Sequence, residues 1–186
     1  NKINKIGIKT QKENRSFLKI INKISIYENN RYISVTPADE FSIDVEINYP
    51  NTIIGGDKLI YVHNKTNFIK NIAKARTFAF AEDIQKMRAT GLAIGGNLNN
   101  AIVVDKYKIV NSTGLRINNE FIKHKTLDCL GDFYLLGMPI IGKVTCFAPG
   151  HKINQNFIKE ILKKTTNYKI ENRNEYNSFN CYLNEE

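Results

Sequence analysis

The seven residues FSIDVEI at positions 41–47 constrain the fold most strongly, because apolar and polar residues alternate strictly along them. A period of two places the four apolar side chains on one face of an extended chain and the three polar ones on the other. We therefore predict a half-buried antiparallel strand here. Strand-like runs at 17–27 and 31–36 precede it, separated by the turn 28–30, so the first part of the chain is expected to form a sheet.

The later part of the chain predicts helices that alternate with further strands. Helices are expected at 67–74 after an N-cap at Thr66, at 81–89, at 120–136 and at 154–164, and strands at 58–63, 77–80, 101–104 and 140–147. This order predicts an α+β fold: a two-layer sandwich of a mixed, mainly antiparallel sheet with helices on one face. A small βαβ insert is expected at about 75–105, within a domain at 16–170 that lies between a linker at 1–15 and a polar tail at 171–186.

Composition and charge narrow the classes of function. With 42% hydrophobic and 24% charged residues, collagen-like and wholly disordered chains are excluded. Three cysteines without a C-x-x-C pair favour a reducing compartment, and we expect a cytoplasmic protein. The net charge of +9 suggests an anionic partner. Because the lysines are spread along the chain and no nucleic-acid motif is present, we expect no nucleic-acid partner. A small substrate that carries phosphate would be attracted by the same positive charge.

Two histidines have neighbours that suggest chemistry. His124 and Asp128 are four residues apart on the expected helix 120–136, so both side chains project from one face, and Asp132 lies one turn further along. An imidazole and a carboxylate at this spacing can hold a divalent cation if a third ligand comes from elsewhere. From spacing alone, a His–Asp pair on a helix surface is the commoner explanation. His151 follows a Pro-Gly turn, where it is equally an exposed loop histidine or a group at the edge of a site.

Four sequence blocks together resemble a known family. They are ARTF at 75–78, GLAIGGNLNNAIVVD at 91–105, HKTLDCLGD at 124–132 and GHKIN at 150–154. Their order and spacing resemble the zinc-dependent UDP-3-O-acyl-N-acetylglucosamine deacetylases of lipid A synthesis, and the likeness runs from about Ser16 to Lys164. It implies two similar α+β domains, each with an insert and with the active site between them. This chain corresponds to the second, C-terminal domain.

The resemblance implies a metal site and its catalytic groups. His124 and Asp128 match two of three zinc ligands, and ferrous iron is also compatible with such a ligand set. Bound zinc polarises an amide carbonyl and lowers the pKa of water towards about 7. Thr77 matches the hydroxyl that stabilises the oxyanion, His151 the histidine across from the metal, and Asp132 the carboxylate that orients this histidine.

Substrate contacts are implied in the same way. Lys125 matches a residue that contacts the phosphate or nucleotide portion, and Arg31 and Asn48 fall where the family contacts the UDP group. The insert corresponds to a hydrophobic passage for the acyl chain. Its expected lining and neighbouring substrate contacts are Phe78, Ile84, Ala93, Gly96, Leu98 and Val103. For the insert residues, a place in the core of the insert is the competing explanation.

The expected function is deacetylation of UDP-3-O-acyl-N-acetylglucosamine, with the missing N-terminal domain of the same enzyme as partner. In the family, the third ligand and the general base form a Glu-His pair in that first domain. No Glu-His dipeptide occurs in this sequence, so the isolated chain is expected to be inactive. A transient contact with a membrane surface is compatible with such a substrate. Two alternatives remain open: a non-catalytic module that binds acyl chains or nucleotide sugars, and a nucleic-acid binder with a contiguous basic face.

Overall fold

Seven strands form the main sheet in the part of the chain that the structure describes, residues 5–7, 9 and 13–173 of a computed structural model. They are β1 (Arg15–Ile20), β2 (Ile24–Glu28), β3 (Arg31–Thr36), β4 (Phe41–Tyr49), β5 (Gly55–Val62), β9 (Ile140–Phe147) and β10 (Tyr168–Arg173). The alternating run at 41–47 lies in β4, and its apolar side chains face the core as predicted.

Strand β9 is the centre of this sheet because it pairs with three other strands. It is antiparallel to β3 and parallel to β4, and its first two residues pair in parallel with β1. The outer strands β2, β5 and β10 pair in antiparallel fashion with β3, β4 and β1, respectively. Most of β9 is buried, and from Gly142 on its buried residues alternate with more exposed ones, as expected for a strand with one covered face.

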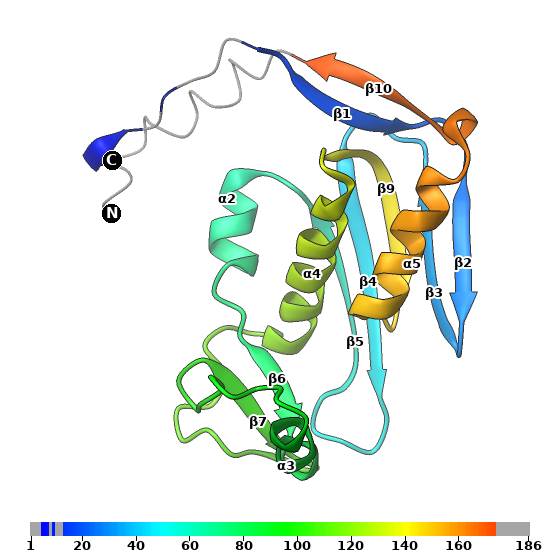
Figure 1. Cartoon of the computed structure of the whole chain (residues 1–186). Helices are drawn as coiled ribbons and strands as arrows, with labels where there is room; N and C mark the ends of the chain where they lie inside the picture. The colour runs from blue at the N-terminus through cyan, green and yellow to red at the C-terminus, as the bar shows by residue number, and fades with distance from the viewer. Residues whose placement is uncertain (1–4, 8, 10–12, 174–186) are drawn as a thin grey trace.

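Two helices cover one face of the sheet (Figure 1). They are α4 (Glu120–Phe133), which continues as the 3-10 turn η2 (Tyr134–Leu136), and α5 (His151–Leu162). Buried side chains from both helices and from the sheet form one core, in which Ile122 and Phe157 are fully enclosed. The predicted two-layer α+β sandwich is confirmed. No helix in the described ranges is both long and apolar enough to span a membrane.

The predicted βαβ insert forms a second, smaller sheet at one end of the molecule (Figure 1). Strand β6 (Thr77–Phe80) leads into α3 (Ala81–Ala89), and the chain returns in β7 (Ala101–Asp105), which is parallel to β6. The short strand β8 (Lys108–Ile109) adds to β7 in antiparallel fashion. A buried asparagine, Asn111, holds the returning chain, since its side chain bonds to Val103 N–H and to two carbonyl oxygens of the insert.

Several helix boundaries differ from the prediction for local reasons. The helix expected at 67–74 is instead α2 (Lys65–Asn67) followed by the π-helical turn η1 (Phe68–Ile72). Its cap is Asn64, whose side-chain oxygen accepts from Asn67 N–H, so Thr66 does not cap it. Helix α5 begins three residues earlier than expected, because extended Gly150 is its N-cap.

The chain ends of the domain also differ from the prediction. Arg15, expected in a linker, begins β1, and residues 171–173, expected in a polar tail, belong to β10. Tyr168–Arg173 follow the last 3-10 turn, η3 (Thr165–Asn167), and pair with β1 along its whole length. The other residues of the expected linker and tail fall in part outside the described residues.

We predict opposite effects for alanine at two glycines. A Cβ on buried Gly142 in β9 would lie 3.0 Å from the Ile20 side chain and 3.1 Å from the Thr36 carbonyl oxygen. Gly142→Ala should therefore lower the free energy of unfolding by about 2 kcal/mol through overpacking. Gly131→Ala, on the exposed side of α4 with no atom within 4 Å of the new Cβ, should raise it by about 0.5–1 kcal/mol. Urea unfolding followed by circular dichroism measures both, and a Gly142→Ala protein as stable as the parent would contradict the close packing at β9.

Candidate metal and catalytic site

Three polar side chains meet on one face of α4. His124 Nε2 lies 3.2 Å from Asp128 Oδ1, and Lys125 Nζ lies 3.0 Å from the other carboxylate oxygen of Asp128. All three side chains are mostly shielded from solvent. The helical spacing thus brings together the two residues that the sequence suggested as metal ligands.

Asp128 carries its charge despite this shielding. Burial opposes ionisation of the carboxyl group, but the hydrogen bond from His124 and the positive charge of Lys125 outweigh it. The pKa of Asp128 therefore lies below its usual value. At neutral pH this group is a carboxylate, which is the form that binds metal ions.

The second ring nitrogen of His124 fixes how the imidazole is presented. Nδ1 lies 3.4 Å from the carbonyl oxygen of Ala75, and a carbonyl only accepts hydrogen bonds, so Nδ1 carries a hydrogen. Phe78 from β6 contacts the ring at right angles, with 6.3 Å between ring centroids. Nε2 is consequently the nitrogen that faces Asp128, and a cation bound between them would replace the hydrogen bond that now joins them.

A second cluster joins the end of α4 to the start of α5. His151 Nδ1 lies 2.9 Å from Asp132 Oδ2, and Asn154 Nδ2 donates to the same oxygen at 2.7 Å. Asn154 is fully buried, whereas the His151 side chain is 66% exposed. Asp132 thus fixes the orientation of an imidazole whose other nitrogen is free to face solvent or a bound molecule.

The turn before His151 brings Arg31 to this cluster. Arg31 Nη1 would lie only 2.7 Å from a Cβ on Gly150, so the flexible guanidinium passes close to the chain just before His151. Arg31 and Asn48 lie at the same end of the sheet, on either side of β9, because Tyr32 and Glu46 both pair with Phe147. They line different hollows: Arg31 one of about 610 Å³ around the β2–β3 turn, and Asn48 one of about 530 Å³.

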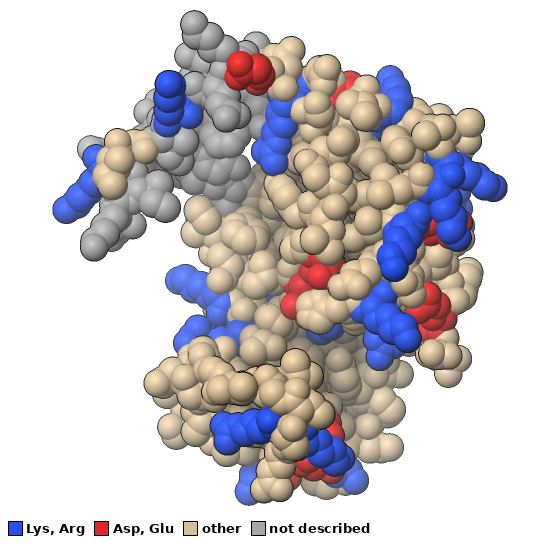
Figure 2. Space-filling view, viewed as in Figure 1, with Lys and Arg blue, Asp and Glu red and all other residues tan. Residues whose placement is uncertain are grey.

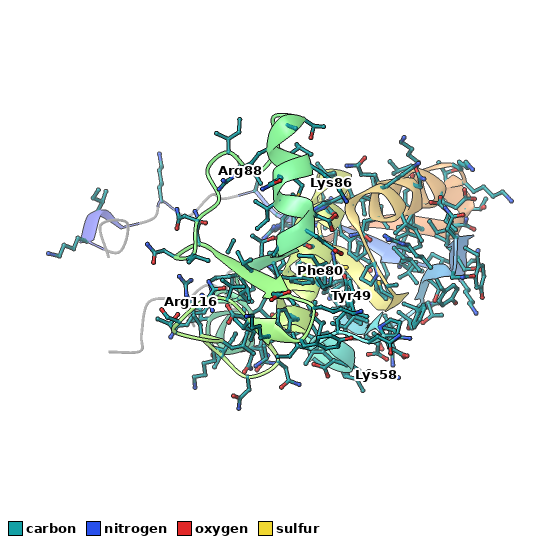
Figure 3. The ribbon with its side chains drawn as sticks, turned by 90° about the horizontal axis from the view of Figure 1, so that it is seen from below. Tyr49, Lys58, Phe80, Lys86, Arg88 and Arg116 are labelled. Atoms are coloured by element: carbon teal, nitrogen blue, oxygen red, sulfur yellow. The ribbon has the colours of Figure 1, made fainter. Side chains whose placement is uncertain are left out.

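The hollow at Asn48 lies between the main sheet and the insert. Its walls include Tyr49 from β4 and Phe80 from β6, whose ring centroids are 6.1 Å apart. Figure 3 labels these two residues close together at the lower end of α3 in that view, with Lys86 and Arg88 on α3 and Arg116 to the left. On the face seen in Figure 2, Lys and Arg side chains are dispersed over several elements.

The remaining predicted substrate residues occupy different environments in the insert. Thr77 is exposed at the start of β6, and Phe78 packs against Tyr49 and Phe121 as well as His124. The side chains expected to line an acyl passage divide into a half-buried and an exposed group. Half-buried are Ile84, Gly96 and Val103, and exposed are Ala93 and Leu98. The structure therefore brings Phe78 to the candidate metal ligands, while Ala93 and Leu98 lie on the surface of the loop between α3 and β7.

The described residues offer an incomplete metal site. Among them, no three His, Cys, Asp or Glu side chains converge closely enough to hold a metal ion. The donors at hand are His124 Nε2 and Asp128 Oδ1, and imidazole nitrogen with carboxylate oxygen is a set that zinc accepts. Two protein donors are one fewer than a catalytic zinc site has, so the described residues fit part of such a site.

Sequence reasoning missed two features of the site. Asn154 lies three residues after His151 on α5, and this spacing could have indicated that both reach Asp132. The buried ion pair of Arg76 and Glu120 joins residues 44 positions apart, which no local pattern indicates.

Comparison with known proteins identifies the family of this chain. The family model described as UDP-3-O-acyl N-acetylglycosamine deacetylase matches residues 1–163. Proteins named UDP-3-O-acyl-N-acetylglucosamine deacetylase from a Nitratiruptor species and from Campylobacter hominis are 40% and 37% identical over 168 residues. These matches cover 90% of this chain but 56% and 57% of the relatives, so the chain spans little more than half their length. The chain belongs to the UDP-3-O-acyl N-acetylglycosamine deacetylase family.

Proposed function

We propose that this chain is the C-terminal half of a zinc-dependent enzyme that removes acetate from UDP-3-O-acyl-N-acetylglucosamine in lipid A synthesis. The observation that carries this proposal is the pair of oriented clusters on neighbouring helices, one at His124 and Asp128 and the other at Asp132 and His151. Family membership supplies the substrate class. The proposal includes a cytoplasmic location and, because such a substrate carries an acyl chain, a transient contact with a membrane surface.

In this proposal, His124 and Asp128 hold the metal. Bound zinc, or ferrous iron, would polarise the acetamide carbonyl and activate water for hydrolysis. The Ala75 carbonyl orients the imidazole through Nδ1, so that Nε2 faces Asp128 and the metal would take the place of the hydrogen between them. Lys125 keeps Asp128 ionised before binding and contributes positive charge for the diphosphate of the substrate.

His151 is proposed as the proton donor to the leaving amine. Its Nδ1–H donates to Asp132, so Nε2 is the atom that would approach the substrate. Asp132 is held in turn by the amide of buried Asn154. Thr77 would supply a hydroxyl to the developing oxyanion, a role for which a preorganised donor contributes about 3 kcal/mol.

The insert and the adjacent sheet would hold the rest of the substrate. Phe78, Ile84 and Val103 offer half-buried apolar surface for the acyl chain, with Ala93, Gly96 and Leu98 on the loop beside it. Arg31 lies against Gly150, next to His151, where its charge would meet the UDP group. Asn48 would contribute from the neighbouring hollow.

A second domain would complete the site. The chain spans 56% of its relative from Nitratiruptor, and the described residues provide two metal donors. We propose that the remaining part of such an enzyme supplies the third ligand and the general base. The isolated chain would therefore be inactive.

The first prediction concerns metal affinity. The isolated chain should bind Zn²⁺ weakly at His124 and Asp128, because catalytic zinc sites have three protein ligands. Competition with a chromogenic chelator measures this affinity, and it should rise by orders of magnitude when the second domain is present. Tight stoichiometric zinc in the isolated chain that survives His124→Ala would contradict the ligand assignment.

The second prediction separates metal ligands from orienting groups in the complete enzyme. Asp128→Ala should lose metal and activity together, whereas Asp132→Asn and His151→Ala should lower kcat and leave the metal bound. The double change at Asp132 and His151 should be clearly less than additive, because residues that act as a unit fail together. Metal analysis and steady-state rates test this. Loss of metal from Asp132→Asn, or fully additive rate losses, would show that Asp132 does not act through His151.

A further inference from the structure

The most deeply buried ion pair in the described chain joins Arg76 and Glu120, whose side chains are 3% and 0% exposed. The Glu120 carboxylate accepts four hydrogen bonds. Three come from Arg76, through its backbone N–H at 2.9 Å, Nε at 2.8 Å and Nη2 at 3.0 Å, and the fourth from the backbone N–H of Arg116 at 2.6 Å. Arg76 Nη2 also donates to the Gly114 carbonyl at 2.8 Å. Every oxygen and most donors of this pair are therefore committed to defined partners.

These partners belong to both ends of the insert. Arg76 immediately precedes β6, where the chain enters the insert, and Gly114 and Arg116 lie where the chain has left it. Glu120 is the first residue of α4. One carboxylate thus attaches the entry and the exit of the insert to the first turn of the helix that carries the candidate metal ligands.

The Arg76–Glu120 pair, called the anchor below, lies one helical turn from His124, since Glu120 and His124 are four residues apart on α4. On the other side, Arg76 lies between Ala75, whose carbonyl faces His124 Nδ1, and Thr77. We propose that Glu120 is a positioning residue: by holding Arg76, it sets where the Ala75 carbonyl meets His124 and where Thr77 stands relative to the metal ligands. This inference rests on the proposed function of His124 as a metal ligand.

The negative charge of Glu120 suits it to this positioning role, because both oxygens of an ionised carboxylate accept hydrogen bonds. Burial opposes its ionisation, but the hydrogen bonds from Arg76 and Arg116 outweigh that effect, so the pKa of Glu120 lies below its usual value. Glutamine has the same shape, but its amide nitrogen bears hydrogens and cannot accept from the donors on that side. Glu120→Gln therefore removes part of the anchor without creating a cavity.

The test uses the 186-residue chain and NMR signals of the His124 imidazole during titration with ZnCl2. The chain has three histidines, so the signals are assigned with His63→Gln and His151→Gln variants. Glu120→Gln should weaken zinc binding at His124 about tenfold, the lower range for loss of a group that orients a ligand. It should also speed hydrogen exchange of the Arg76 and Arg116 backbone amides. Glu160→Gln, which breaks the exposed pair with Lys163 on α5, is the matched control and should change neither.

Each outcome bears on the proposal. A Glu120→Gln protein that is less stable but binds zinc like the parent when folded would show a merely structural role and overturn the inference. If Glu120→Gln does not fold, Arg76→Lys replaces it, because lysine keeps the charge but cannot bond to Glu120 and Gly114 at once. If zinc does not move the His124 signals of the parent chain, the proposed metal site is wrong. The positions of those signals in the parent and in Glu120→Gln then still test the positioning, and identical positions would overturn it.

Discussion

The pairing of β9 with three strands fixes the distance between the two halves of the candidate site. Helix α4, which carries His124, Asp128 and Asp132, leads into β9, and α5, which begins at His151, leaves it. Because β9 pairs with β1 at its first two residues and with β3 and β4 along the rest, the strand cannot slide without breaking pairs with all three neighbours. The contact between Asp132 and His151, 19 residues apart, is therefore a consequence of the length of β9 and of the turns that flank it.

The local sequence favours the backbone conformation of the first of those turns. Gly137 ends the 3-10 turn after α4 with φ +77°, and glycine adopts this left-handed conformation without steric cost. After β9, Ala148 has φ +49° and Gly150 is extended where Arg31 passes close to the chain. The reversal places His151 at the first position of α5, with Asn154 one turn later on the side of Asp132.

Sequence reasoning was accurate where one local pattern determined the structure. The bounds of β9, the helix α3 and the parallel βαβ arrangement follow from apolar runs, period and loop glycines, and the i, i+4 spacing placed His124 beside Asp128. It was wrong at 67–74, where the Asn64 side chain caps a different turn from the one expected at Thr66. Sequence periodicity does not indicate contacts between residues that are far apart in the chain. The contact of Asp132 with His151 was expected only from resemblance, and Arg76 with Glu120 was not expected.

Glu120 holds the insert through backbone groups at its two ends. Its backbone partners are Arg76 N–H, Arg116 N–H and, through the Arg76 guanidinium, the Gly114 carbonyl, and all of them lie outside the strands and helix of the insert. Side chains between β6 and β8, including Ile84, Leu98 and Val103, make no contribution to these bonds. The insert is therefore held on α4 in two ways: hydrogen bonds to Glu120 fix its two ends, and Phe78 of β6 packs against Phe121 and His124. The geometry at His124 depends on both.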